Sequence, residues 1–239
     1  TSTMASGKSV HLRRPEINRI MKINRIMKRS FTVTVALLGM IILGSFAQAQ
    51  EPNARAQLER FSEGLQSLHA RFDQRVIGSD GSVQDGSSGE VWLQRPGLFR
   101  WEYGGEFPEQ VIADGKNIWI YDEVLEQVTV KNQTEAAVNS PLTLLTDLGQ
   151  LDSQFEVREV GQADELQLIE LRSRSAESEF ERILLGMTND ILQMMVMEDA
   201  FGLRTEIRFD QVKRNPELDP LLFTFDPPES ADVIGEIQR

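Results

Sequence analysis

The stretch GEVWLQRPGLFRWEY, residues Gly89 to Tyr103, alternates large apolar and polar side chains with the period of two that is typical of β-strands. The triplet Arg95-Pro96-Gly97 interrupts the alternation and predicts a turn between two antiparallel strands. Arg95 is unusual here because it stands among large apolar residues, where a guanidinium is costly unless its donors are used. The stretch therefore predicts a β-hairpin whose arginine holds another segment of the chain.

Short strand-like runs separated by turn residues continue on both sides of this hairpin, which indicates consecutive antiparallel strands. An amphipathic helix over residues 53–68 precedes them, with Leu58, Phe61, Leu65 and Leu68 on one stripe and Asn53 as its N-cap. We expect strands near residues 70–77, 89–95, 98–103, 109–114, 117–122, 125–131, 154–160, 165–173, 178–185, 191–198 and 203–212.

A short apolar helix is expected to divide the two runs of strands. Ser140 and Pro141 have the order of an N-cap and a first helical residue, and Gly149 supplies a stop. Because a single sheet of roughly ten strands curls strongly, the pattern predicts a mainly β protein with helices (α+β): an unclosed antiparallel β-barrel, or half-barrel, with helices on its concave side.

The N-terminal region is expected to be an export signal. Basic residues lead into the apolar run 31–46, which ends in Ala-Gln-Ala, a small-x-small cleavage pattern after Ala49. An uncleaved membrane anchor is the alternative, since the run lies near the length that spans a bilayer. We interpret residues 1–20 as an upstream extension or tag, 21–49 as a signal peptide and 50–239 as one domain of a periplasmic protein.

The charge of residues 50–239 limits the possible partners. Eight of the 25 basic residues and one of the 37 acidic residues precede residue 50, so the remainder has a net charge of −19. Such a surface repels nucleic acids and anionic lipid, which argues against either as a partner. The chain has no cysteine, so neither disulfides nor lipid attachment through a cysteine is expected.

The inventory of reactive side chains favours binding over catalysis. His69 is the single histidine after residue 49 and there is no cysteine, so no metal site, no cofactor and no catalytic triad is expected. Three readings remain open: a carrier of an apolar ligand, an exported hydrolase that uses scattered carboxylates, and a structural envelope protein. Aromatic and methionine side chains gather in the expected strands, which suits a surface for flexible apolar guests.

The segment WLQRPGLFRWEY resembles the periplasmic outer-membrane lipoprotein carrier family LolA, in which an arginine-proline pair is followed by aromatic residues, here Phe99 and Trp101. Four further segments share the resemblance: SLHARFDQ, VIADGKNIWIYDEVLEQV, NSPLTLL and FTFDPP. The chain departs from the pattern at ESADVI, where we expect a glycine, and in its N-terminal extension. The resemblance covers most of residues 50–239.

The resemblance implies a half-barrel with a helical lid over an apolar cavity, in a monomer that is not an enzyme. It implies three partners: lipoproteins held by their acyl chains, an inner-membrane ABC-type complex that releases them, and a lipid-anchored receptor in the outer membrane. Arg95 would latch the lid by binding carbonyl groups in residues 141–148. We predict these residues for the apolar cavity: Phe99, Trp101, Trp119, Leu142, Leu145, Val91, Leu93 and Met195.

Overall fold

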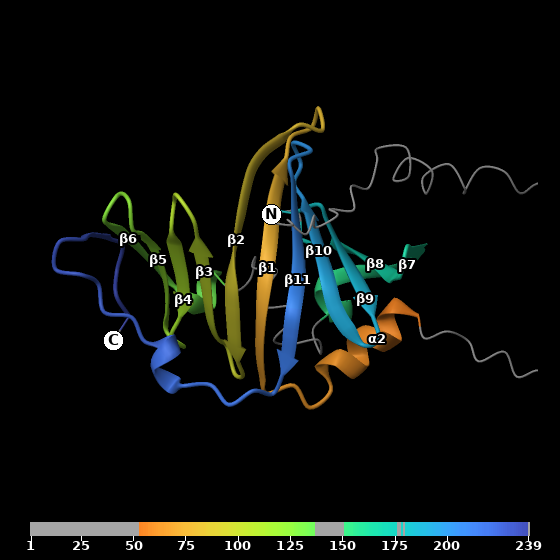
Figure 1. Ribbon diagram of the computed structural model, residues 1–239, viewed down its shortest axis with the longest axis horizontal. Coiled ribbons are helices and arrows are strands. Elements are labelled where there is room, and N and C mark those ends of the chain that lie inside the picture. The colour runs from red at the N-terminus through yellow and green to blue at the C-terminus, as the bar shows by residue number, and fades with distance from the viewer. Residues whose placement is uncertain (1–52, 137–150, 176–177, 179, 239) are drawn as a thin grey trace, which may run out of the picture. The chain divides into compact units, whose positions relative to one another are not determined.

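The computed structural model describes residues 53–136, 151–175, 178 and 180–238, which form an open antiparallel sheet with α-helix α2 against one face (Figure 1). The strand order is β12-β6-β5-β4-β3-β2-β1-β11-β10-β9-β8-β7, and the two end strands do not pair with each other. The sheet is therefore unclosed, as the sequence predicts. It is antiparallel except at β12, which pairs with β6 in parallel and was not expected.

The bounds of strands β1 to β11 agree with the expected ones to within a few residues, except that β2 begins earlier and β9 later than predicted. In chain order the elements are α2 (Ala54–Ser62), β1 (Ser67–Ile77), β2 (Val83–Gln94), β3 (Leu98–Gly104), β4 (Glu109–Ala113), β5 (Asn117–Asp122), β6 (Gln127–Asn132), α3 (Gln133–Ala136), α5 (Leu151–Gln154), β7 (Phe155–Ala163), β8 (Leu166–Ser173), β9 (Arg182–Thr188), β10 (Ile191–Glu198), β11 (Arg204–Arg214), the 3-10 helix η4 (Pro220–Phe223) and β12 (Asp232–Ile234).

Helix α2 is shorter than the apolar stripe suggests. The Asn53 side chain accepts from the Ala56 N–H, as expected of the N-cap, but the helix ends at Ser62 and Gly64 follows with φ of +64°. Leu65 and Leu68 are buried all the same. Their helical spacing was misleading, because the chain turns at Gly64 and Leu68 enters the core from β1 instead.

The pairing register divides the apolar side chains between two faces of the sheet. Leu68, Leu93 and Phe99 are direct neighbours across β1, β2 and β3, and Ala70, Val91 and Trp101 form the next such row. Because side chains alternate along a strand, these rows share the face that α2 covers, which we call the inner face. The main core lies there and combines α2 with strands from β1 to β11.

The opposite, outer face carries a smaller core beneath the C-terminal chain. Trp119 packs against Phe225 with ring centroids 5.6 Å apart, and its indole N–H donates to the Asp114 carboxylate over 2.7 Å. Asp114 also accepts from the backbone N–H groups of Lys116 and Asn117. The Asn117 side chain in turn bonds the backbone of Gln238 in both directions, so one carboxylate organises the turn that secures the tail.

Gly89 allows two strands and an aromatic ring to meet on the inner face. A Cβ at this position would lie 1.8 Å from the Glu102 carbonyl oxygen and 2.9 Å from Cε1 of Phe72. We expect Gly89→Ala to lower the free energy of unfolding by about 3 kcal/mol, because backbone atoms must shift. Gly86→Ala is the matched control in the same strand, with its Cβ 3.7 Å from the Gln74 oxygen, and should cost less than about 0.5 kcal/mol. Urea denaturation of both variants measures the difference, and equal midpoints would contradict this account.

The ionisation of the Asp114 carboxyl should make the free energy of unfolding depend on pH in the acidic range. Partial burial raises the pKa of this carboxyl, but the hydrogen bonds from Asn117, Trp119 and Lys116 outweigh it and leave the pKa below its usual value. A lowered carboxyl pKa stabilises the fold above the unfolded-state pKa, and this contribution disappears as the pH falls through the folded-state pKa.

We therefore expect Asp114→Asn to cost about 1–3 kcal/mol of unfolding free energy at pH 7. The difference from wild type should shrink as the pH falls below about 4, where the unfolded chain begins to bind the proton, and should vanish only below the lower folded-state pKa of Asp114. Chemical denaturation at pH 7 and pH 3 measures both values. Asp73→Asn, at an exposed position of β1, is the control and should show neither effect.

Candidate functional site

An apolar pocket lies on the inner face, between Phe61 of α2 and the middle strands of the sheet. It contains about 380 Å³ of empty space, part of it open to solvent. Its lining residues among those that the structure describes are all apolar: Phe61, Leu68, Ala70, Val91, Leu93, Phe99, Trp101, Leu192, Phe209 and Val212.

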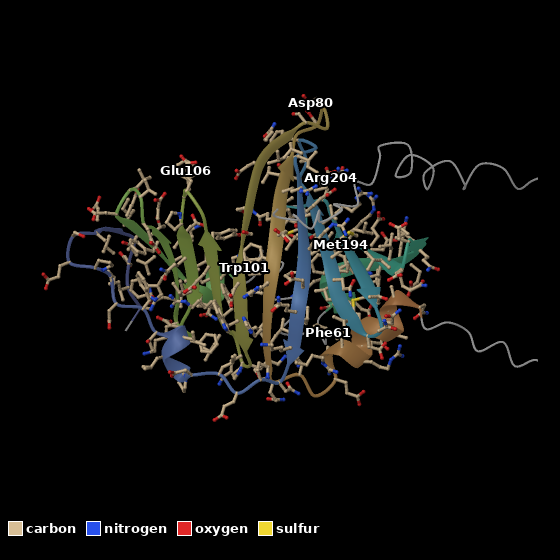
Figure 2. The ribbon with its side chains drawn as sticks, viewed as in Figure 1. Phe61, Asp80, Trp101, Glu106, Met194 and Arg204 are labelled. Atoms are coloured by element: carbon tan, nitrogen blue, oxygen red, sulfur yellow. The ribbon has the colours of Figure 1, made fainter. Side chains whose placement is uncertain are left out.

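The pocket is built from the two cross-strand rows of β1, β2 and β3. Phe61 of α2 closes it on one side and Trp101 of β3 on the other, from opposite sides of β1 and β11 in the view of Figure 2. Trp101 is held by aromatic neighbours, with ring centroids 4.6 Å from Phe72 and 6.2 Å from Phe209. The Trp101 ring, packed against Phe72 and Phe209, therefore forms one side of the pocket, and Leu68, Val91 and Leu93 contribute aliphatic side chains to its lining.

Four of the residues predicted for the cavity lie together in this pocket: Val91, Leu93, Phe99 and Trp101. The alternation of β2 and β3 brings them to one face, with Leu93 opposite Phe99 and Val91 opposite Trp101. Met195 belongs to the same core but lies farther along the sheet on β10, where it is 1% exposed.

Trp119 does not line this pocket, so the prediction that it forms part of the apolar cavity is wrong. It pairs with Ile112, whose other cross-strand neighbour is Arg100, and this row lies on the outer face. Ile118 and Ile120, on either side of it in β5, point to the inner face instead. The sequence shows which residues of a strand alternate, but it does not show which set faces inward.

Arg95 lies in the turn after β2, so it does not continue the strand face of Val91 and Leu93. Its side chain is half-buried, with Nε shielded from solvent, and its backbone N–H donates to the Gln66 carbonyl over 2.8 Å. The side chain is thus not a freely solvated surface arginine. Leu142, Leu145 and the expected helix from Pro141 lie outside the described residues.

Six lining residues were not predicted. Ala70 on β1 and Phe209 and Val212 on β11 come from segments that were expected to be strands, whereas Leu68 was assigned to the first helix; the place of all four depends on pairing between segments about 140 residues apart. Phe61 and Leu192 come from α2 and β10. The lining residues from β1, β10 and β11 meet in space only because of the pairing register of the sheet, and Phe61 joins them from α2.

Helix α2 is anchored firmly at both ends. The N–H groups of Ala54 and Arg55 donate to the Glu159 carboxylate on β7, and Arg214 donates to the carbonyls of Arg60 and Glu63 at the other end. Two bidentate ion pairs join its exposed side to the rest of the fold, Arg55 with Asp152 and Arg60 with Asp190. The helix is consequently tied to the sheet at both ends and along its exposed side.

Polar groups gather on the inner face next to Trp101. The Tyr103 hydroxyl lies 3.3 Å from Oε1 of Gln74, and burial together with the charge of Glu109 raises the pKa of Tyr103 to about 12. Burial, and then the charge of Asp122, also raises the pKa of Glu109 above its usual value. The arrangement offers neutral donors and acceptors beside a negatively charged edge.

Two further properties concern the described part of the chain. Within it, no three acidic or histidine side chains are grouped so that they could hold a metal ion. None of its helices has the length and apolar character needed to cross a membrane.

Comparison with known proteins agrees with this geometry. An outer-membrane lipoprotein carrier protein of Dechloromonas aromatica is 35% identical over 216 residues, covering 90% of this chain and all of the relative. One from Xanthomonas campestris is 40% identical over 195 residues, covering 81% and 93%. An uncharacterised conserved protein of Thermus thermophilus shares the fold, with a TM-score of 0.50 at 16% identity over 76% of this chain and 98% of its own. The model of the family "Outer membrane lipoprotein carrier protein LolA" matches residues 63–226, and the chain therefore belongs to the LolA family.

Proposed function

We propose that this protein is a periplasmic carrier that shields the acyl chains of lipoproteins on their way to the outer membrane. The observation that carries the proposal is the apolar pocket on the inner face of an open sheet, in a chain of the LolA family. A non-catalytic role fits the same site, because its described lining is apolar throughout.

The size of the pocket sets a condition on binding. Three acyl chains contain roughly 45 methylenes, whose gross transfer free energy is on the order of 35 kcal/mol. The pocket's space of about 380 Å³ includes gaps between atoms and open solvent, so the room for a ligand is much smaller than this figure. The cargo therefore requires the pocket to widen, and the element that moves is not α2, which is anchored at both ends.

Arg95 is the proposed latch of the cover. Its guanidinium can hold several carbonyl groups at once, whereas a lysine cannot present the same planar set of donors. The proposed partners are carbonyls of residues 141–148, and the half-buried position of Arg95 supports such a role. Opening this contact would offset part of the hydrocarbon transfer energy and so bring net affinity into a range that permits release.

The proposed route begins at an inner-membrane ABC-type complex and ends at a lipid-anchored outer-membrane receptor. The domain of residues 50–239, freed by cleavage after Ala49, would be the travelling form. The family membership and the small-x-small pattern before residue 50 support this part of the proposal.

Incubation with membranes that contain labelled lipoproteins tests the carrier role. We expect the purified protein to leave the membranes in a soluble one-to-one complex with the lipoprotein, because the pocket replaces the bilayer around the acyl chains. The control is the same cargo anchored by a transmembrane helix, which must remain in the membrane. Failure to release the lipoprotein, with the release complex and ATP present, would count against the carrier role.

Substitution of Arg95 tests the latch. Arg95→Leu should still collect lipoprotein but should deliver it to receptor-containing membranes at least about tenfold more slowly, because closure no longer competes with cargo. The matched control is Arg75→Leu, at an exposed position on the outer face of β1, which should deliver cargo at the wild-type rate. Normal delivery by Arg95→Leu would contradict the latch while leaving the carrier role intact.

A further inference from the structure

The turn that carries Arg95 is held at both of its ends. At its start, the backbone N–H of Arg95 donates to the Gln66 carbonyl over 2.8 Å, which ties the turn to the loop after α2. At its end, the carbonyl oxygen of Gly97 accepts from the side-chain amide of Gln133 over 2.6 Å. The first contact joins two backbone groups, whereas the second depends on one side chain, at the first residue of α3.

Gln133 connects this turn to a second one, between β4 and β5. Its side-chain oxygen Oε1 accepts from the backbone N–H of Gly115 over 2.9 Å, and its own backbone N–H donates to the Lys116 carbonyl over 2.9 Å. The two turns lie at the same end of the sheet, because β2 to β5 form consecutive antiparallel hairpins. One amide group therefore joins the turn after β2 to the turn after β4.

This bonding pattern requires an amide side chain. An amide presents a donor and an acceptor on the same terminal group, whereas a carboxylate only accepts and an ammonium only donates. Gln133 uses both functions, and its Nε2 lies so close to the turn that a Cβ at Gly97 would approach it to 3.2 Å. The side chain is half-buried, so solvent competes less with these bonds than it would at an exposed position.

The position of the turn matters because the two strands that it joins contribute to the pocket. Leu93 of β2 and Phe99 of β3 lie on either side of the turn, and both line the pocket. The guanidinium of Arg95 stands at the end of a long side chain, so its position depends on the backbone from which it extends. Functional side chains of this kind need supporting residues that hold them in place through hydrogen bonds.

We propose that Gln133 is a positioning residue for cargo release, which holds the turn at Gly97 where Arg95 can act as the latch. Arg95 remains the residue that makes the latch contact, and Gln133 acts through it. The inference rests on the proposed function and adds to it, because it names a residue that controls the delivery step. Without the amide, the turn keeps its contact with Gln66 but loses the one at Gly97, so Arg95 closes less effectively.

A double-mutant cycle with labelled lipoprotein tests whether Gln133 acts through Arg95. Gln133→Leu removes the amide and should slow delivery to receptor-containing membranes about three- to tenfold, the effect of about one hydrogen bond, while collection of lipoprotein stays unchanged. In the Arg95→Leu background the same change should alter delivery less than about twofold, because the latch is already absent. A role confined to folding would slow delivery equally in both backgrounds.

Two further variants separate the functions of the amide. Gln133→Lys keeps a donor for the Gly97 carbonyl and should deliver cargo within about twofold of the wild-type rate, whereas Gln133→Glu keeps only the acceptor for Gly115 and should be as slow as Gln133→Leu. Should Gln133→Leu fail to fold, the contrast between these two variants decides alone. The matched control is Gln162→Leu on β7, which removes an amide donor from the Asp164 carbonyl at 2.8 Å, in another turn, and should leave delivery unchanged.

The outcomes separate the positioning role from the carrier role. Delivery by Gln133→Leu at the wild-type rate overturns the positioning role, as does equal slowing in the Arg95→Leu background or slow delivery by Gln133→Lys, and all three leave the carrier role in place. Loss of collection by Gln133→Leu also overturns it, because the residue would then act on binding. Normal delivery by Arg95→Leu overturns the latch and this inference with it. If the wild-type protein collects no lipoprotein, the carrier role itself fails.

Discussion

The inner face of the sheet gathers more apolar surface than α2 can cover, and the rest of the structure follows from this imbalance. Alternation along the strands sends Leu93, Phe99 and Trp101 to the same side as the residues that pack under α2. The helix lies against β8, β9 and β10, so the middle of the sheet keeps an apolar pocket. A filled core would be more stable, but it would leave no space for a guest.

The contacts that hold α2 against the sheet are largely electrostatic. Exposed ion pairs contribute little one at a time, but α2 has two bidentate pairs as well as carboxylate and guanidinium contacts at its ends. Detaching the helix would break all of these contacts together. The proposed latch depends on Arg95 alone, so the cover could open while α2 stays in place.

The sequence predicted the open sheet, the turn at Arg95 and four pocket residues, because these depend on local alternation and on the family's motifs. It misplaced Trp119, since the face of β5 follows from the hairpins that join β3, β4 and β5, and not from alternation within β5. It also overextended the first helix, because Leu65 and Leu68 keep helical spacing by chance after the chain has turned at Gly64. Contributions from β11 required a long-range register that no local pattern contains.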